Sequence, residues 1–147
     1  MTLTELFNQS GCLSEEIKSF LKKSTYSEYN DCSGLDIDFE NADDLQKWDE
    51  IQRIACELEK SVNMIDRICR PISLGQKIHI NSRGRYETAD GTHEYTCGDS
   101  IEYLSSDDFD ERTKWKFSSV EARNGKYYIV AEPMLEMEGL LIRRRKR

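Results

Sequence analysis

Three patterns of hydrophobic and polar positions follow one another along the chain. Apolar residues recur every three or four positions near the start and again through a long middle segment, and they alternate with polar residues over much of 77–143. The first two patterns are typical of amphipathic helices, and the third is typical of short strands. We therefore expect an α+β protein: N-terminal helices, including one long amphipathic helix, followed by a small SH3-like antiparallel β barrel.

The first 23 residues predict two short helices. Thr2-Leu3-Thr4-Glu5 has the form of a capping box, and Gly11 is expected to end the helix that it starts. Ser14 is expected to cap a second helix. Its apolar face consists of Leu13, Ile17, Phe20 and Leu21.

The next segment, residues 24–41, allows two interpretations. Apolar and acidic residues alternate from Leu35 to Glu40. This period of two favours a half-buried edge strand. An acidic loop held by three apolar side chains fits the same pattern equally well.

The strongest helix signal in the chain covers residues 43–69. Eight apolar positions form a stripe on one face: Leu45, Trp48, Ile51, Ala55, Leu58, Val62, Ile65 and Cys69. A helix of this size is about 40 Å long, which exceeds a small barrel. Part of the stripe therefore needs cover, either from the N-terminal helices or from another subunit, so self-association through the 43–69 helix is one candidate for a partner.

Turn signals divide the rest of the chain into five or six short strands. Asn124-Gly125 and Asp90-Gly91 are strong hairpin turns, and the other breaks follow every 8–12 residues. Such spacing favours a small, strongly bent barrel. We place a domain boundary at Pro71, with a helical region at 1–70 and the barrel with a basic C-terminal tail at 71–147.

Several motifs of the barrel region resemble an uncharacterised domain family of Gram-positive (Firmicutes) bacteria and their plasmids, phages and conjugative elements. The motifs are Gly84-Arg85-Tyr86-Glu87, Gly98-Asp99-Ser100-Ile101-Glu102, Trp115, Val120-Glu121, Asn124-Gly125-Lys126-Tyr127-Tyr128 and Glu138-Gly139-Leu140 through Arg143. The resemblance covers roughly residues 70–145. It implies a β module of unknown function, and it brings no established catalytic or ligand residues.

Charge is unevenly distributed. Residues 1–75 carry a net charge of −7 and residues 76–142 carry −5, whereas the tail Arg143-Arg144-Arg145-Lys146-Arg147 carries +5. An acidic body disfavours broad duplex binding, because such binding depends on neutralising many phosphates. The tail is the one basic cluster, and we expect that folding does not require it.

The cysteines indicate a reducing compartment. Five cysteines are present, none in CxxC spacing, and the start of the chain lacks a basic segment followed by an apolar run. We expect free thiols in a cytoplasm. No run of about 18 apolar residues occurs, so no membrane partner is expected.

Enzymatic and metal chemistry have little support in the sequence. Cys97 and His93 form the nearest pair of candidate ligands or nucleophile and base, but two further zinc ligands are missing and no oxyanion hole is evident. Phosphate-binding glycine loops and HExxH are absent. We expect no catalytic residue, no metal and no cofactor.

The favoured function is a non-enzymatic interaction module that binds a protein partner through the helix stripe and the barrel aromatics. The alternative is an accessory nucleic-acid-binding protein that uses the basic tail and the barrel face. Exposed aromatic and cationic side chains serve both hypotheses. The candidate binding residues are Lys116, Arg123, Tyr127, Tyr128, Arg143, Arg144, Arg145, Lys146 and Arg147.

Overall fold

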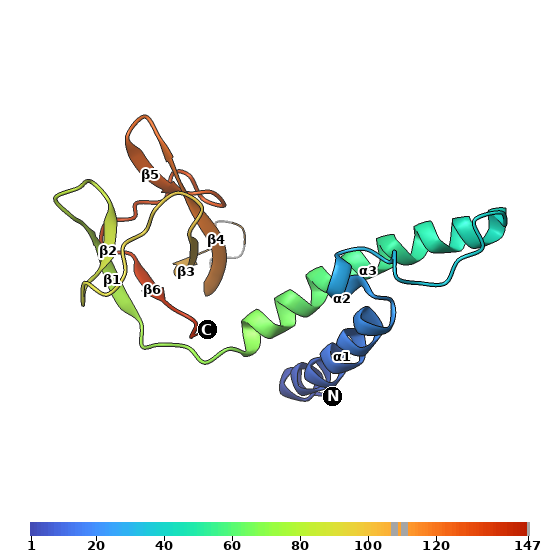
Figure 1. Ribbon diagram of the computed structural model, residues 1–147. Helices are drawn as coiled ribbons and strands as arrows, with labels where there is room; N and C mark the ends of the chain where they lie inside the picture. Colours follow the sequence, from blue (N-terminus) through green and yellow to red (C-terminus); the bar gives the residue numbers. More distant parts are fainter. Residues whose placement is uncertain (107–108, 110–111, 147) are drawn as a thin grey trace. The chain divides into compact units, whose positions relative to one another are not determined.

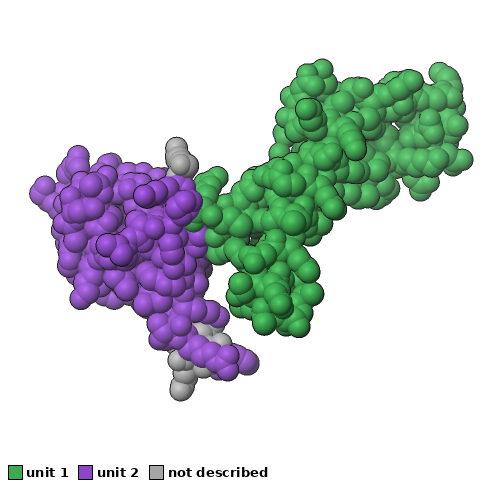
Figure 2. Space-filling model, turned by 90° about the horizontal axis from the view of Figure 1, so that it is seen from below, with its two compact units in different colours: residues 1–70 green, residues 71–147 purple. Residues whose placement is uncertain are grey.

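The chain forms two compact units in the computed structural model, which describes residues 1–106, 109 and 112–146. Met1–Arg70 make up a helical unit and Pro71–Arg147 make up a β module (Figure 2). All the strands of the described residues lie in the second unit, after the helices (Figure 1). The predicted α+β class is therefore confirmed.

Three helices form the helical unit: α1 (Leu3–Lys23), α2 (Tyr26–Tyr29) and α3 (Ala42–Cys69). The capping box is confirmed, since the Glu5 backbone N–H donates to the Thr2 hydroxyl at 3.1 Å and the Thr2 N–H donates to the Glu5 carboxylate at 2.6 Å. Asn41 caps α3 by accepting from the N–H groups of Asp43 and Asp44. Both long helices thus begin where side chains satisfy their first backbone donors.

The prediction of two short N-terminal helices is wrong, because α1 runs without interruption through Gly11. Glycine in a helix interior costs only about 1 kcal/mol relative to alanine. The packing of the following turns against α3 outweighs that cost. Ser14, the expected cap of the second helix, is buried instead, and its hydroxyl donates to Asp66 of α3 at 3.3 Å.

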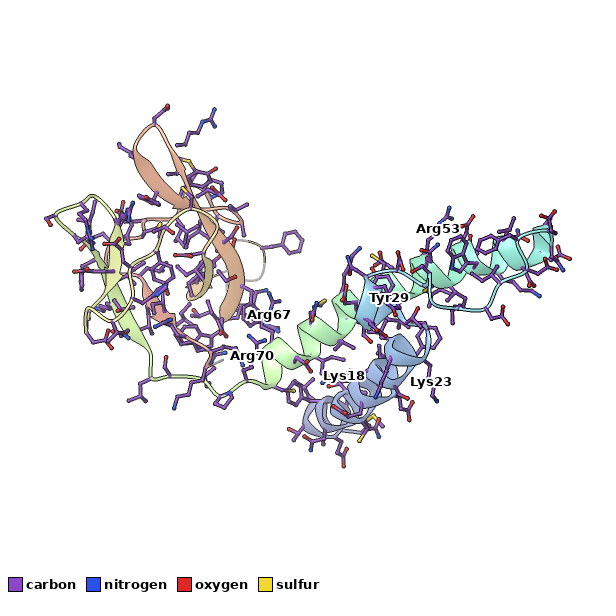
Figure 3. All side chains as sticks on the ribbon, in the orientation of Figure 1. Lys18, Lys23, Tyr29, Arg53, Arg67 and Arg70 are labelled. Carbon is purple, nitrogen blue, oxygen red and sulfur yellow. The ribbon has the colours of Figure 1, made fainter. Side chains whose placement is uncertain are left out.

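The stripe of the long helix is partly covered by α1. Ile17 and Leu21 of α1 share a core with Ala55 and Val62 of α3. Beside this core, Lys18, which Figure 3 labels on α1, places its Nζ 3.1 Å from the Asp66 carboxylate. Three further apolar residues of α3 stay largely exposed: Ile54, Met64 and Ile68.

The segment before α3 is a loop, so the edge-strand interpretation is wrong and the acidic-loop alternative is right. Residues 35–40 belong to no helix or strand. The loop is anchored by the indole of Trp48, which donates to the Cys32 carbonyl at 3.0 Å and meets the ring of Phe39 edge to face at 6.0 Å. The apolar side chains of the alternating segment therefore lie against α3, and the segment does not need to pair with a sheet to cover them.

Six strands form one curled antiparallel sheet in the β module. They are β1 (Gln76–Ile80), β2 (Tyr86–Thr88), β3 (Ser100–Ser106), β4 (Thr113–Arg123), β5 (Lys126–Ile129) and β6 (Leu141–Arg143), in the order β2-β1-β6-β3-β4-β5. The strand number agrees with the prediction. The β4–β5 turn is confirmed too, since Asn124 and Gly125 both have positive φ, as a type I′ hairpin requires. The finer SH3-like assignment stays a prediction.

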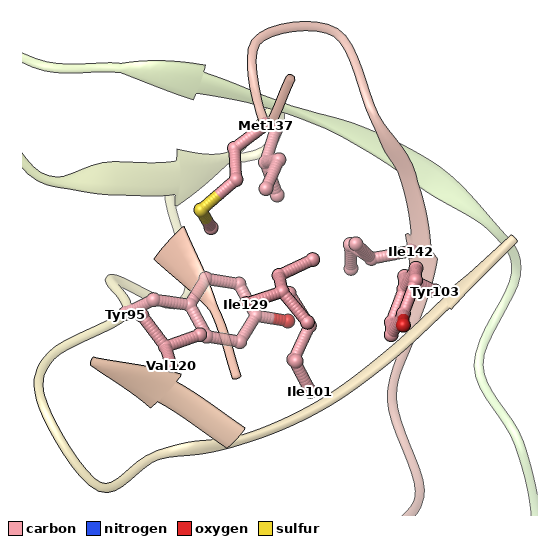
Figure 4. Packing of buried hydrophobic residues seen from close by; sticks show 8 residues of the cluster. Tyr95, Ile101, Tyr103, Val120, Ile129, Met137 and Ile142 are labelled. Atoms are coloured by element: carbon pink, nitrogen blue, oxygen red, sulfur yellow. The ribbon is translucent and has the colours of Figure 1, made fainter. Parts of the chain in front are cut away.

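The core of the β module fills the inside of the curl. Figure 4 shows Tyr103, Ile129 and Ile142 from three strands meeting there with Tyr95 from the β2–β3 connection. Tyr95 and Tyr103 are the largest of the fully buried side chains. Two aromatic residues of the β module, Tyr95 and Tyr103, thus belong to the core, and Tyr86 and Tyr127 pack at its margin.

Replacing Gly11 by alanine should stabilise the helical unit. A Cβ at Gly11 meets no atom within 4 Å, so the gain in helix propensity, roughly 0.5–1 kcal/mol, is not offset by a clash. Gly34→Ala is the matched control, because its Cβ would lie 2.7 Å from Thr25 Cγ2 and should destabilise the unit. Urea denaturation followed by circular dichroism measures both, and a loss of stability in Gly11→Ala would contradict the continuous helix.

Candidate functional site

Two of the five tail cations are built into the sheet. Arg143 Nη2 lies 2.7 Å from Glu102 Oε1, and Arg145 Nε lies 2.8 Å from Glu102 Oε2. Glu102 is 5% exposed and lies in β3, where it is paired with Arg143 of β6. Hydrogen bonds of this charge-assisted kind fix the last strand against β3.

Aromatic side chains of β4 complete this arrangement, which we call the Glu102 clamp: Glu102, Arg143, Arg145, Trp115 and Phe117. The Arg143 guanidinium lies 4.4 Å from the Trp115 ring centre, and that of Arg145 lies 5.3 Å from the Phe117 ring centre. The expectation that folding does not require the tail is therefore wrong for Arg143 and Arg145. The sequence showed a run of cations but not the single buried carboxylate that they face.

The other tail residues differ from this pair. Arg144 and Lys146 are exposed, although their backbone N–H groups donate to Ser73 Oγ at 2.9 Å and to the Pro71 carbonyl at 2.8 Å. Arg147 lies outside the described residues. The tail therefore presents fewer available cations than its sequence suggests.

Lys116 is held by an ion pair and does not line either hollow beside β5. Its Nζ is 3.3 Å from the Glu132 carboxylate, which accepts a hydrogen bond from the Tyr103 hydroxyl at 2.6 Å. Burial, the Glu132 hydrogen bond and its charge raise the pKa of Tyr103. The contacts of Glu132 with Lys116 and Tyr103 hold the segment after β5 against the core, and this structural role explains the position of Lys116.

The two outer strands of the sheet differ at their outer edges. The outer edge of β2 is covered, since the Thr88 N–H donates to the His93 carbonyl at 2.9 Å and the Tyr95 N–H donates to the Tyr86 carbonyl at 2.8 Å. Strand β5 ends the strand order on the other side, where no strand of the described residues pairs with its outer edge (Figure 1). On this side Ile129 is bridged to Glu132, whose N–H donates to the Ile129 carbonyl at 3.1 Å. Among the described residues, the open edge of the β module is therefore the part of β5 before Ile129.

The hairpin fixes which backbone groups of β5 point outward. Arg123 and Lys126 close the two-residue turn, and the Val130 N–H donates to the Ser119 carbonyl at 3.0 Å. In an antiparallel ladder, hydrogen-bonded and non-hydrogen-bonded pairs alternate. The backbone groups of Lys126 and Tyr128 therefore face β4, and the N–H groups of Tyr127 and Ile129 face outward.

Two shallow hollows flank this edge and share Lys126, Tyr127 and Pro133. We call them together the β5 groove. The first is lined by Arg123, Lys126, Tyr127, Tyr128, Val130 and Pro133. The second continues from the shared residues across to the start of β2 and is lined by Ile80, Gly84, Tyr86, Gly125 and the segment 133–137. The structure thus brings three of the predicted binding residues, Arg123, Tyr127 and Tyr128, into one site.

The curl of the sheet brings β2 and β5 together across this second hollow. Arg85 beside β2 hydrogen-bonds to Glu94 and to the Tyr127 side chain, and the two contacts raise the pKa of its guanidinium. The Arg85 hydrogen bond in turn lowers the pKa of the Glu94 carboxyl. Arg123 and Lys126, on the β5 side, are exposed. The groove therefore combines an aromatic floor with exposed cations at one end.

The residues considered for catalysis and metal binding have other surroundings. His93 packs edge to face on Tyr95 at 4.6 Å and lies 4.0 Å from Asp99, and burial followed by the charge of Arg144 lowers its pKa. Cys97 is exposed. In the part of the chain that the structure describes, no three His, Cys, Asp or Glu side chains are grouped to hold a metal. Nor does any described helix have the length and apolarity to cross a membrane.

In the described residues, fold and site together define a small α+β protein with a curled β module and a groove along part of its outer strand β5. In the comparison with known families, residues 76–144 match the model described as a domain of unknown function, DUF5348. The predicted resemblance to an uncharacterised domain family is confirmed to that extent, and its bacterial and mobile-element setting stays a prediction. No curated protein and no solved structure matches the chain.

Sequence analysis did not predict which outer strand has an open edge, nor that Pro133 lines the groove. Tyr127, Tyr128 and Arg123 were found from the hairpin signal and their residue types. The covering of β2 by residues 93–95 was implicit in Asp90-Gly91, which the structure confirms as a turn between β2 and that segment. Nothing in the pattern shows which of two outer strands stays open, because strand order is a property of the folded sheet.

Glu102→Gln should destabilise the β module strongly. The substitution leaves two guanidinium groups without their shared carboxylate, and breaking a buried ion pair in this way costs about 3–5 kcal/mol. Chemical denaturation in a Trp48→Phe background, where Trp115 is the remaining tryptophan and its fluorescence reports on the β module, measures the loss. Arg144→Ala, in the same segment but outside the clamp, is the control and should change stability by less than about 0.5 kcal/mol.

The loss of stability caused by Glu102→Gln should also depend on pH. Burial alone would raise the pKa of Glu102, but the hydrogen bonds from Arg145 and Arg143 outweigh it and the net pKa is lowered. The clamp's stability is therefore fully present above the unfolded carboxyl pKa of about 4.3 and is lost as pH falls through the lower folded pKa. The difference in unfolding free energy between the native chain and Glu102→Gln should shrink over that range, and a constant difference would contradict the assignment.

Proposed function

We propose that this protein is a non-enzymatic interaction module whose β module binds an extended peptide segment of a protein partner along β5. The observation that carries the proposal is the contrast between the two outer strands: β2 is covered by residues 93–95, whereas β5 is bridged to Glu132 at Ile129 but is open at Tyr127, which lies in a groove. In strand addition, backbone hydrogen bonds provide affinity, and pockets for alternate side chains provide specificity. The β5 groove offers both features.

Protection against aggregation is the other explanation for a short, lysine-bearing edge strand. Strand β5 has four residues and contains Lys126, so its length and charge fit that explanation. The residues around β5 do not favour protection against aggregation. Val130 and Met134 are 46% and 97% exposed beside the edge, and apolar side chains placed there add attraction rather than protection.

Nucleic-acid binding, the alternative function, has less support. Arg143 and Arg145 are engaged with Glu102, and Arg83 and Arg85 contact Glu94. A single-strand binder combines stacking aromatics with a continuous cationic path along the phosphates. Around the β5 groove Arg123 and Lys126 supply positive charge, but Glu136 lines the same groove.

The broader parts of the proposal rest on sequence patterns. An SH3-like topology is our interpretation of the curled sheet, and the bacterial cytoplasmic setting follows from the resemblance and the cysteine spacing. Ile54 and Met64, which are exposed apolar residues of α3 outside the stripe, form a second surface that a protein partner could cover.

Binding should depend on the outward N–H group of Tyr127. Peptides that bind the full chain are first selected from a random display library and labelled. Fluorescence anisotropy then measures the affinity of each peptide for two variants. Tyr127→Ala removes the side chain alone, and Tyr127→Pro removes the outward N–H as well, at an edge position that tolerates proline. We expect Tyr127→Pro to bind about tenfold more weakly than Tyr127→Ala, since a lost hydrogen bond costs about 1 kcal/mol and the proline ring hinders strand pairing.

Circular dichroism and thermal unfolding confirm that both variants are folded. Equal affinities for the two variants would show that peptides bind away from the β5 edge. A library that yields no peptide, or a chain that shifts single-stranded DNA in a gel instead, would also count against peptide binding.

A further inference from the structure

We propose that the β5 groove recognises a segment in which apolar and acidic residues alternate, and that residues 35–40 of a second copy of this chain are such a segment. This inference rests on the proposed strand addition and names the chemistry of the ligand. It follows from the two faces of the β4–β5 hairpin and from a segment of the helical unit that the fold leaves without a strand partner.

The hairpin presents opposite chemistry on its two faces. Arg123 and Lys126 are directly paired across the strands and therefore lie on one face, which also carries the directly paired Glu121 and Tyr128 further from the turn. The two cations at the turn outnumber the one carboxylate. Tyr127 and Ile129 lie on the other face, where Ile129 is fully buried and Tyr127 packs against the core. A strand added to β5 would continue both faces, so it would meet cations on one side and an apolar surface on the other.

A segment that matches both faces must alternate with a period of two. Residues 35–40 read Leu-Asp-Ile-Asp-Phe-Glu, which places three apolar side chains on one face of a strand and three carboxylates on the other. Paired with β5, the apolar side chains would meet the hollow lined by Tyr127, Leu135 and Met137. The carboxylates would lie on the face of Arg123 and Lys126.

The present position of this segment leaves it accessible. Asp36, Asp38, Phe39 and Glu40 are exposed, and Phe39 is 65% exposed despite its contact with Trp48. Leu35 and Ile37 are half-buried against α3 beside a shallow hollow. Pairing with β5 would therefore exchange a partial apolar contact for a more complete one and add backbone hydrogen bonds.

Charge supports a second copy as the occupant. The helical unit is acidic and contributes the carboxylates, whereas the β5 hairpin contributes Arg123 and Lys126. The two surfaces lie on different units of the chain, so each copy could give its segment to one neighbour and accept one from another. Such a head-to-tail contact forms closed rings or open chains of copies.

A synthetic peptide of residues 33–41 tests the ligand chemistry. We expect it to bind the full chain in fluorescence anisotropy and to displace library-selected peptides. A peptide with Asp36, Asp38 and Glu40 replaced by lysine, and one with the same composition in an order that breaks the alternation, should each bind at least tenfold more weakly. Added salt should weaken the native peptide, because the carboxylate–cation pairs lie at the surface.

A charge exchange separates direct pairing from general attraction. The chain with Arg123→Glu and Lys126→Glu should lose the native peptide and prefer the lysine peptide. If neither native nor exchanged peptides bind, while library-selected peptides still respond to Tyr127→Pro, the ligand pattern is wrong and the proposed strand addition stands. If Tyr127→Pro does not change the affinity for library-selected peptides, the proposed strand addition is wrong.

Sedimentation velocity of the full chain tests the second copy. Self-association should rise with concentration and fall at least tenfold in the Asp36→Lys, Asp38→Lys chain. It should return when that chain is mixed with the Arg123→Glu, Lys126→Glu chain. The control Glu16→Lys, Asp49→Lys makes the same charge change at exposed positions elsewhere in the helical unit and should leave self-association unchanged. A monomer at every concentration, or equal loss in the control, overturns the inference.

Discussion

The β module depends on one buried carboxylate. Glu102 receives Arg143 and Arg145 from the end of the chain, and Trp115 and Phe117 cover the two guanidinium groups. Strand β6 has three residues and lies between β1 and β3, so backbone pairing alone gives it little hold. A buried ion pair adds modest net stability, but it strongly disfavours every arrangement that leaves one charge unpaired. We infer that the clamp mainly fixes the register of β6.

That constraint shapes the rest of the sheet. With β6 held in the middle of the strand order, β1 and β3 pair with it on either side, and β2 and β5 become the outer strands. The segment after Asp90-Gly91 covers β2, and the β4–β5 hairpin leaves β5 open ahead of the bridge between Ile129 and Glu132. The position of the groove therefore depends on the strand order that the clamp holds in place. The tail contributes to the site through the fold rather than through free positive charge.

Sequence periodicity was sufficient for the elements that local physics determines. The long helix, the Thr2 cap, the Asn124-Gly125 turn and the number of strands follow from spacing and turn chemistry. Gly11 and the 35–40 segment could not be predicted in this way, because packing against α3 decides both. The same limit applies to Arg143 and Arg145 at the candidate site. Their positive charge suggested that they bind a partner molecule, whereas in the structure they bind Glu102 of the same chain.

The central claim is that β5 is an open edge which becomes paired when a peptide binds. Amide hydrogen exchange, resolved by residue with NMR, tests it most directly. The Tyr127 amide should exchange quickly in the free chain, while Tyr128, whose N–H faces β4, and Ile129, which is bridged to Glu132, should be protected. On saturation with a library-selected peptide, Tyr127 should become protected and Tyr128 should change little. Protection of Tyr127 already present in the free chain, or no change on saturation, would contradict the claim.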